Sequence, residues 1–299
     1  MQIVGSEYLD PNILSALPNI EFIARRLVDG LFVGMHKSPH FGYSVEFKDH
    51  RDYVPGDDLR IVDWKVWGRK DKYFVKRFEM ESQLKATILL DCSRSMDFGE
   101  DRLTKLQYAS YLAASLAYLI IHQNDMAGLV TFDTDIHHYL PARGSRSHMR
   151  SILKAIGDVQ PGPATNVPQV CNHLAQLIKS RGIIILISDL LDDVEETLHA
   201  VRHLQYKKHE VIVFHVLDDA ELNLPYEALA NFEDLESRRV QVVDPLAFQS
   251  EYQNRVKDYC EALRTGCQKT SVDYHLVNTS QPVETFLANY LTFRARRSR

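Results

Sequence analysis

Short, uninterrupted apolar runs that end on an aspartate constrain this 299-residue chain more than any other feature. Three runs share the pattern: residues 86–90, 183–187 and 211–217. The aspartates that close them are Asp91, Asp189 and Asp218. Runs of this length and composition are typical of strands that are buried on both faces of a parallel sheet. The chain therefore needs helices on both sides of that sheet to cover it.

Helical and strand-like stretches alternate from about residue 85 onward. Helices are predicted at residues 103–122, 147–156, 168–180, 194–205, 246–263 and 283–293. Further strands are predicted at residues 127–132, 136–140 and 271–277. This alternation indicates βαβ units with right-handed crossovers, and so an α/β fold of three layers, Rossmann-like, around a doubly wound, mostly parallel sheet. Ligands of such sheets bind beyond the carboxyl ends of the strands, so the strand-end aspartates are the first functional candidates.

The first 83 residues follow no such alternation. Glycine, proline, histidine and aromatic residues are mixed there, with one helix predicted at residues 11–28 and one strand at residues 73–78. We therefore expect an irregular N-terminal extension over residues 1–83 and an α/β domain over residues 84–299.

Composition and motifs exclude several functional classes. The 35 basic and 40 acidic residues give a net charge of −5, which argues against a nucleic-acid-binding footprint. The most apolar helical stretch, residues 106–121, is shorter than the ~20 residues of a membrane span. Signal-peptide, phosphate-loop and nucleophile-elbow patterns are absent from the sequence. Because the four cysteines show no CxxC spacing, we expect buried free thiols in a reducing compartment. Without a signal-peptide pattern or a membrane span, a cytoplasmic location is expected by default.

The turn after the first buried strand carries a carboxylate and two hydroxyls at alternate positions: Asp91, Ser93 and Ser95. Hard oxygen donors suit Mg²⁺ or Mn²⁺ better than zinc. Taken alone the pattern is weak, because Asp91 could simply cap the following helix. A loop threonine, Thr165, and a second strand-end carboxylate, Asp189, add to it.

The order and spacing of these residues resemble the metal-ion-dependent adhesion site of von Willebrand factor type A domains. That site uses D-x-S-x-S, then a threonine, then an aspartate. The resemblance implies a metal site made of Asp91, Ser93, Ser95, Thr165 and Asp189. It also implies direct ligation by the three hydroxyls, with the aspartates acting largely through water and the sixth position left for an acidic group of a partner. Neutral hydroxyl ligands leave the ion's charge partly uncompensated, which favours recognition over hydrolysis.

Residues 42–82 resemble the signature of the bacterial family known as domain of unknown function 58. The matching positions are Gly42, Glu46, Phe47, Arg51, Tyr53, Gly56, Asp57, Asp58, Arg60, Asp63, Trp64, Arg69 and Glu79. Val62 and Gly68 depart from it, since isoleucine and alanine are usual there. Members often accompany AAA+ ATPases of the MoxR type, so the resemblance implies such a partner. The alternating arginines and aspartates favour an internal clamp of ion pairs, although exposed Asp57 and Asp58 would instead suit partner binding.

These observations predict a non-enzymatic protein-interaction module that binds an acidic group through Mg²⁺ or Mn²⁺. Its expected partners are a MoxR-type AAA+ ATPase and an unidentified protein client. Two alternatives stay open: a metal-dependent hydrolase acting on phosphate esters, and a scaffold that keeps the motif but works without metal. His199 and His203 have zinc-capable spacing on a predicted helix, but an exposed helix face explains them better.

Overall fold

The structure is a computed structural model that describes residues 24–28, 47–54, 62, 66, 73–78, 83–99, 103–162, 166–226, 230–233 and 240–297. The chain divides into two compact units. One consists of Met1–Gly34 together with Leu84–Arg299, and the other consists of Met35–Gln83. The candidate site belongs to the first of these units.

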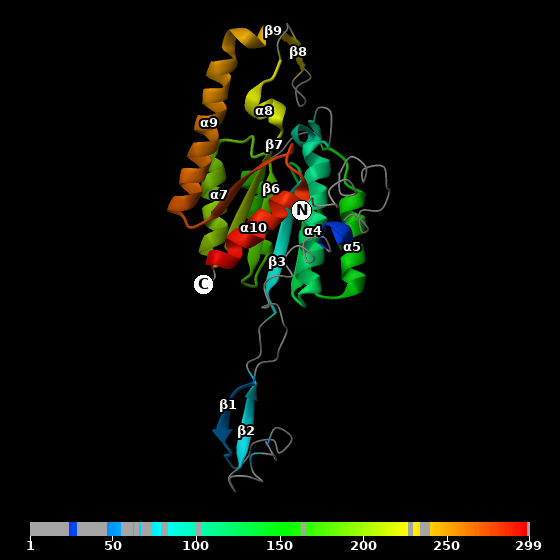
Figure 1. Ribbon diagram of the computed structural model, residues 1–299, viewed down its shortest axis with the longest axis vertical. Helices are drawn as coiled ribbons and strands as arrows, with labels where there is room; N and C mark the ends of the chain where they lie inside the picture. The colour runs from blue at the N-terminus through cyan, green and yellow to red at the C-terminus, as the bar shows by residue number, and fades with distance from the viewer. Residues whose placement is uncertain are drawn as a thin grey trace, which may run out of the picture. The chain divides into compact units, whose positions relative to one another are not determined.

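A six-stranded sheet forms the centre of the described part of the larger unit, in the order β10-β7-β6-β3-β4-β5 (Figure 1). Its strands are β3 (Lys85–Asp91), β4 (Met126–Phe132), β5 (Ile136–Arg143), β6 (Ile183–Ser188), β7 (Glu210–Leu217) and β10 (Asp273–Asn278). Neighbouring strands are parallel except β4 and β5, which are antiparallel. The predicted doubly wound, mostly parallel α/β sheet is therefore confirmed.

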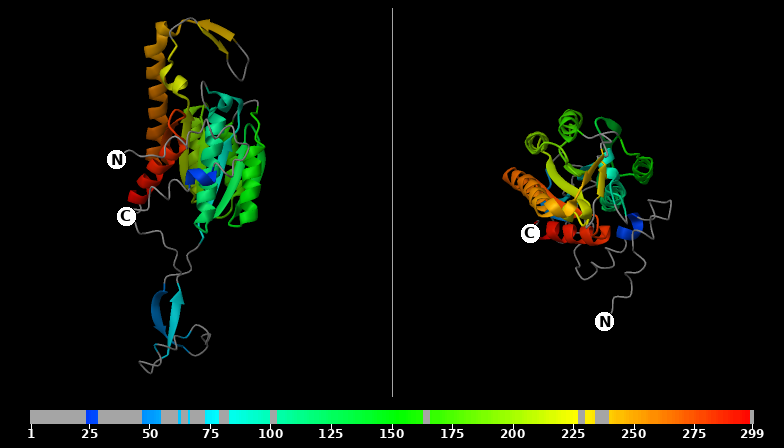
Figure 2. Two further views of the ribbon diagram at one scale, coloured as in Figure 1. Left: turned by 45° about the vertical axis from the view of Figure 1, so that its right-hand side comes forward. Right: turned by 90° about the horizontal axis from the view of Figure 1, so that it is seen from above.

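Helices cover both faces of this sheet (Figure 2). One face packs against α4 (Lys105–His122), α5 (Arg146–Gly157) and α10 (Val283–Arg297). The other face packs against α6 (Val167–Leu177), α7 (Val194–Tyr206) and α9 (Pro245–Lys269). Two short helices, η3 (Arg94–Asp97) and α8 (Asp219–Asn223), follow the carboxyl ends of β3 and β7.

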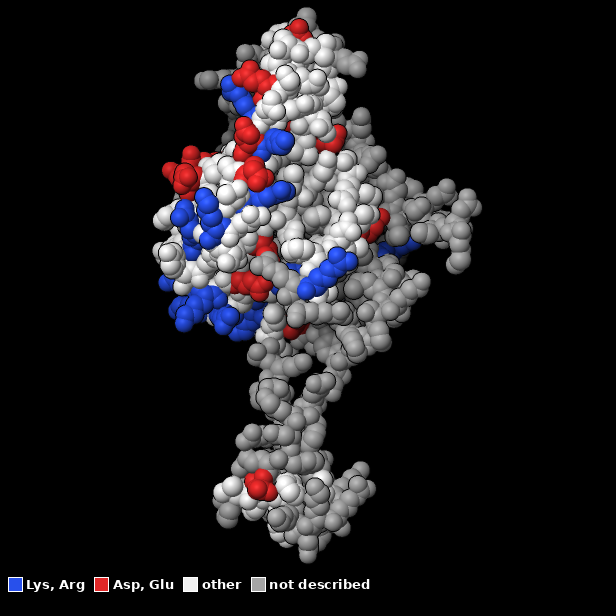
Figure 3. Space-filling view, turned by 60° about the vertical axis from the view of Figure 1, so that its left-hand side comes forward, with Lys and Arg blue, Asp and Glu red and all other residues white. Residues whose placement is uncertain are grey.

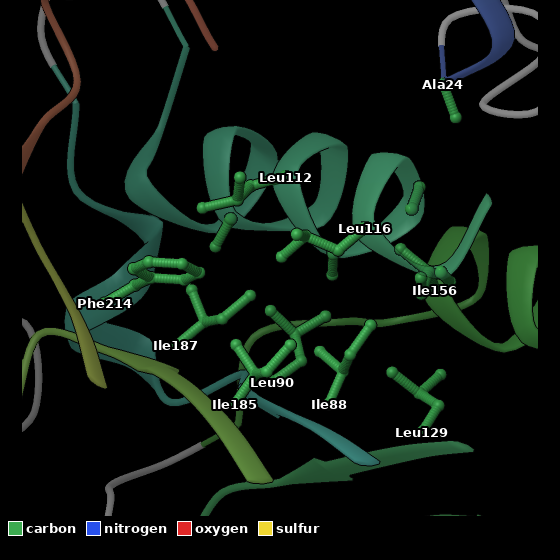
Figure 4. Close-up of a cluster of buried hydrophobic side chains, with 14 of the residues drawn as sticks. Ala24, Ile88, Leu90, Leu112, Leu116, Leu129, Ile156, Ile185, Ile187 and Phe214 are labelled. Atoms are coloured by element: carbon green, nitrogen blue, oxygen red, sulfur yellow. The ribbon is translucent and has the colours of Figure 1, made fainter. Parts of the chain in front are cut away.

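Successive residues of the central strands supply two separate cores. Ile88 and Leu90 of β3 belong to the core under α4, where Leu112 and Leu116 also lie (Figure 4). Leu89, between them in sequence, belongs to the core on the opposite face. Because side chains of a strand alternate between faces, a strand covered on both sides must be apolar throughout. Each large apolar side chain buried in this way contributes about 1.5–3 kcal/mol.

The predicted elements differ from the structure mainly at their ends. The helix expected to reach residue 180 stops at Leu177, and the strand expected at residues 136–140 continues to Arg143 along β4. Helix α9 runs beyond residue 263 to Lys269. Helix α8 and the hairpin of β8 (Ala230–Glu233) and β9 (Val240–Val243) were not predicted, because such short elements carry no long apolar run.

In the smaller unit, β1 (Phe47–Asp52) pairs antiparallel with β2 (Phe74–Phe78), which confirms the predicted strand there. The expected ion-pair clamp falls on the side chain of Arg51 and on residues 57, 58, 60, 63 and 69, which lie outside the described side chains. Of the helix predicted at residues 11–28, residues 24–28 are described and are helical.

Two further expectations concern cysteines and membrane crossing. All four cysteines are free, and Cys92, Cys171 and Cys267 are buried, as expected, whereas Cys260 is partly exposed. Among the described residues, no helix combines the length and the apolar content that crossing a bilayer would require.

Candidate functional site

The carboxyl ends of β3 and β6 bring two aspartates to one edge of the sheet. Asp91 ends β3 and Asp189 directly follows β6, and the two strands are parallel neighbours with Leu90 opposite Ile187. Both aspartates are fully buried. Burial, together with the negative charge of Asp189, raises the pKa of Asp91 to about 7. The negative form of Asp91 is thus disfavoured at this edge of the sheet, and a cation bound beside it would stabilise that form.

The turn after β3 places two hydroxyls beside Asp91. The backbone N–H of Ser93 donates to Oδ1 of Asp91 over 2.9 Å, and the hydroxyl oxygens of Ser93 and Ser95 lie 3.1 Å apart. Both serines are buried. The N-cap of η3 is Ser93. The N-cap of α4 is Thr104, whose side chain accepts from the N–H of Gln107. The alternative that Asp91 caps the following helix is therefore wrong.

The fifth predicted ligand, Thr165, lies outside the described residues, but both flanks of its loop are described. The N–H of Gly162 donates to the carbonyl of Cys92 over 2.6 Å, and the N–H of Asn166 donates to the carbonyl of Asp133 over 3.4 Å. A Cβ at position 162 would lie 1.9 Å from Oδ2 of Asp133, so a larger residue there would displace the Asp133 side chain. Of the five predicted residues, the structure describes Asp91, Ser93, Ser95 and Asp189. These four lie together at the carboxyl ends of β3 and β6.

Ser188 completes the hydrogen bonding of Asp91 and was missed by sequence reasoning. Its hydroxyl donates to Oδ2 of Asp91 over 2.6 Å and accepts from the N–H of Leu190 over 3.0 Å. The hydroxyl of Tyr259 on α9 reaches the same loop, where it donates to the carbonyls of Leu190 and of Asp192, the latter over 3.0 Å. These contacts fix both Asp91 and the loop that carries Asp189.

A buried lysine and a glutamate were also missed. The ammonium of Lys105 donates to Oδ2 of Asp189 over 2.8 Å and to Oε1 of Glu221 over 2.6 Å, and the lysine side chain is 0% exposed. Burial alone would lower the pKa of Lys105, but Asp189 and Glu221 outweigh it and raise that pKa. The available signal was that Lys105 is the lone lysine or arginine in the mostly apolar helix α4. A buried charge requires a partner, although the sequence does not say which one.

The acidic residues that follow Asp189 have local structural roles. Asp193 is the N-cap of α7 and accepts from the N–H of Glu196 over 3.0 Å. Asp192 accepts from the N–H of Val167, at the start of α6, over 2.9 Å. Negative charge at these helix starts is stabilised by unpaired N–H groups and by the helix dipole.

The donors fit a small divalent cation in kind, and the two serine hydroxyls, which are hydrogen bonded to each other, also fit it in spacing. Two oxygens that bind Mg²⁺ side by side at about 2.1 Å lie about 3 Å apart in octahedral geometry, and the Ser93 and Ser95 hydroxyls are separated by 3.1 Å. Among the described residues, no group of three or more His, Cys, Asp or Glu side chains is placed to hold a metal ion. Any metal held at this edge would therefore depend on the serine hydroxyls.

Comparison with known proteins identifies similar chains. A family model described as "Protein of unknown function DUF58" matches residues 49–262. Uncharacterized proteins of Mycobacterium bovis and Mycobacterium tuberculosis are 28% identical to this chain over 233 residues, which is 76% of this chain and 72% of theirs. Two solved structures are also similar. BatB from Bacteroides thetaiotaomicron has a TM-score of 0.48 at 18% identity, with 71% of this chain and 99% of BatB covered. The SpRpn10 VWA domain has a TM-score of 0.37 at 12% identity, with coverages of 69% and 94%.

Proposed function

This chain belongs to the DUF58 family of proteins of unknown function, and we propose that it is a protein-interaction module that binds its partners at the carboxyl edge of the sheet. One observation carries the proposal. Four buried oxygen-bearing side chains from two strand ends meet there: Asp91, Ser93, Ser95 and Asp189. In parallel α/β sheets this edge is where ligands bind.

We propose further that this edge works through Mg²⁺ or Mn²⁺. The hydroxyls of Ser93 and Ser95 would hold the ion, and the carboxylates of Asp91 and Asp189 would balance its charge. When bound, the ion supplies a positively charged coordination position for a carboxylate of the partner. The chain's own part is to orient the donors, and Ser93 and Ser188 do so by hydrogen bonding both oxygens of Asp91.

The role we propose is recognition without catalysis, in the cytoplasm. The expected partners, from the family resemblance, are a MoxR-type AAA+ ATPase and a protein client that presents an acidic residue. In this scheme the module presents the client and the ATPase supplies the work of remodelling it.

Calorimetric titration of the full chain with Mg²⁺ tests the metal. We expect the wild-type protein to bind one ion, and Asp91→Asn and Ser93→Ala each to weaken binding at least tenfold, which corresponds to about 1.4 kcal/mol or more. Asp135→Asn, an exposed carboxylate in the turn between β4 and β5, is the matched control and should bind as the wild type does. No binding by the wild type, or equal binding by all four proteins, would contradict the metal role.

Affinity purification from native extract, with and without chelator, tests the partner. We expect a MoxR-type ATPase, identified by mass spectrometry, to be captured in the presence of Mg²⁺ and lost with chelator or with Asp91→Asn. Capture that is indifferent to both would favour the metal-free scaffold. Hydrolysis of a phosphate ester by the wild type, absent from Asp91→Asn, would instead favour the hydrolase.

A further inference from the structure

The candidate site already contains a cation of its own, the ammonium of Lys105. It lies between two carboxylates, 2.8 Å from Oδ2 of Asp189 and 2.6 Å from Oε1 of Glu221. The lysine and Asp189 are both fully buried. A charged pair shielded from water in this way interacts much more strongly than a surface pair.

Glu221 holds Lys105 in place, and it is itself fixed by two further contacts. Its second carboxylate oxygen accepts from the N–H of Asp218 over 2.8 Å, which completes the capping box of α8. Its carbonyl accepts from the hydroxyl of Tyr252 on α9 over 2.9 Å. Residues of α8 and α9 thus fix Glu221, and Glu221 keeps the ammonium of Lys105 within hydrogen-bonding distance of Asp189.

The position of Lys105 opposes a metal ion in two ways. It neutralises one of the two buried carboxylates that would attract a divalent cation, and its own positive charge repels that cation. Both effects act over short distances in a buried, weakly screened environment. At the same time, the lysine stabilises Asp189 in the folded protein when no metal is bound.

We propose that Lys105 competes with the divalent cation for Asp189 and thereby sets the metal affinity of the site. The inference rests on the proposed function and concerns how that site is tuned. It has two consequences. Without metal, the chain is stable because the charge of Lys105 compensates that of Asp189. With metal, the chain gains less stability from the ion than it would if the lysine were absent.

The test is titration of the full chain with Mg²⁺ in wild type and Lys105→Met, a variant that keeps the length of the side chain and removes its charge. We expect Lys105→Met to bind Mg²⁺ at least tenfold more tightly. Its melting temperature should lie below that of the wild type without Mg²⁺ and rise when Mg²⁺ is added, by more than the melting temperature of the wild type rises. Lys154→Met removes an exposed lysine from α5 and should leave both quantities at wild-type values.

A second variant guards against misfolding. Lys105→Met combined with Glu221→Gln leaves no unpaired charge at position 221, and we expect the same gain in affinity. A purely structural Lys105 would lower the melting temperature with and without Mg²⁺ and would not tighten binding, which overturns the inference but spares the proposed metal role. If neither the wild type nor any variant binds Mg²⁺, both the inference and that metal role fail.

Discussion

Both oxygens of the Asp91 carboxylate accept hydrogen bonds, and the two donors belong to different strand ends. Oδ1 is held by the turn after β3 through Ser93, and Oδ2 by the last residue of β6 through Ser188. A buried carboxylate is tolerated only when such donors replace its water. The hydrogen bonds of Asp91 thus join the two strand ends at which the candidate site lies.

Ser188 and Ser115 allow a paired test of this arrangement. Both are fully buried, but Ser188 donates to Asp91, whereas the hydroxyl of Ser115 in α4 has no hydrogen-bond partner among the described residues. We expect Ser188→Ala to lower the free energy of unfolding by about 1–3 kcal/mol, because it leaves buried polar groups unsatisfied. Ser115→Ala should be neutral or stabilising by up to about 1 kcal/mol, because alanine favours helices and carries no hydroxyl. Urea denaturation measures both, and equal losses would refute the distinction.

His148 gives the fold a dependence on acidity that is independent of the site. Burial lowers the pKa of this imidazole, the carbonyl of Ala127 partly opposes the shift, and Arg143 adds to it. The neutral ring is therefore favoured in the folded state. Its contribution to stability is complete above the ordinary histidine pKa of about 6.5 and is lost as the pH falls through the lower, folded-state value.

We accordingly expect His148→Gln to lose less stability than the wild type does between neutral and mildly acidic pH. The exposed His199→Gln in α7 is the matched control and should follow the wild type. Denaturant midpoints measured across that range decide the matter. If the denaturant midpoints of wild type and His148→Gln change equally with pH, His148 does not contribute to the pH dependence of stability.

At this scale, local sequence was sufficient for some residues and insufficient for others. Asp91, Ser93 and Ser95 could be predicted because a buried strand and the turn after it are adjacent in the chain. The contacts of Lys105 could not, because Asp189 and Glu221 lie 84 and 116 residues away in sequence. Pairing over such separations is decided by how the elements pack.

At the scale of elements, α9 braces the loop that follows β6. Tyr259 donates from the middle of this helix to the carbonyls of Leu190 and Asp192, on either side of Leu191 and next to Asp189. Helix α9 also packs against α7, and its Leu263 and Cys267 belong to the core on that face of the sheet. The loop therefore depends on a helix more than sixty residues away.

Tyr259→Phe tests that brace. We expect the free energy of unfolding of the variant to be about 1–2 kcal/mol below that of the wild type, since the loop loses its hydroxyl donor. Backbone amides of residues 190–193 should also exchange faster with solvent. Tyr206→Phe, on an 85% exposed tyrosine of α7, should change neither quantity. Unaltered amide exchange of residues 190–193 in Tyr259→Phe would mean that the loop stays ordered without this hydroxyl.

The central elements were predictable because their apolar runs are long and are closed by polar residues. The strand of residues 183–187 is a clear example, and β6 spans Ile183–Ser188. Helix α8 and the β8–β9 hairpin were not predictable, since each has only four or five residues. The end of α6 was misplaced because Ile178 and Lys179 suit a helix as well as the extended segment that follows Leu177.

At the scale of the whole molecule, the surface shows no dominance of one charge on the face drawn in Figure 3, where acidic and basic side chains are interspersed. Exposed pairs on α9 illustrate this: Arg255 lies 2.6 Å from Glu251, and Arg264 lies 3.6 Å from Glu261. Pairs of this kind contribute about 0.5 kcal/mol or less.

The fold class and the family were both accessible from the sequence, the first through its alternating pattern and the second through the residues 42–82 signature. The division of the chain was harder to foresee, because residues before Gly34 group with the α/β unit and Met35–Gln83 form a unit of their own. Ala24 and Leu27, for instance, belong to the same hydrophobic cluster as the apolar residues of α4. Contacts between distant parts of a chain leave no local pattern.

Anomalous diffraction from crystals containing Mn²⁺ tests the proposed metal site most directly. We predict a manganese peak within bonding distance of the Ser93 and Ser95 hydroxyl oxygens, and its disappearance from isomorphous crystals of Asp91→Asn. Manganese peaks only elsewhere on the molecule, with the two serine hydroxyls bonded solely to protein or water, would contradict metal-dependent recognition at this edge of the sheet.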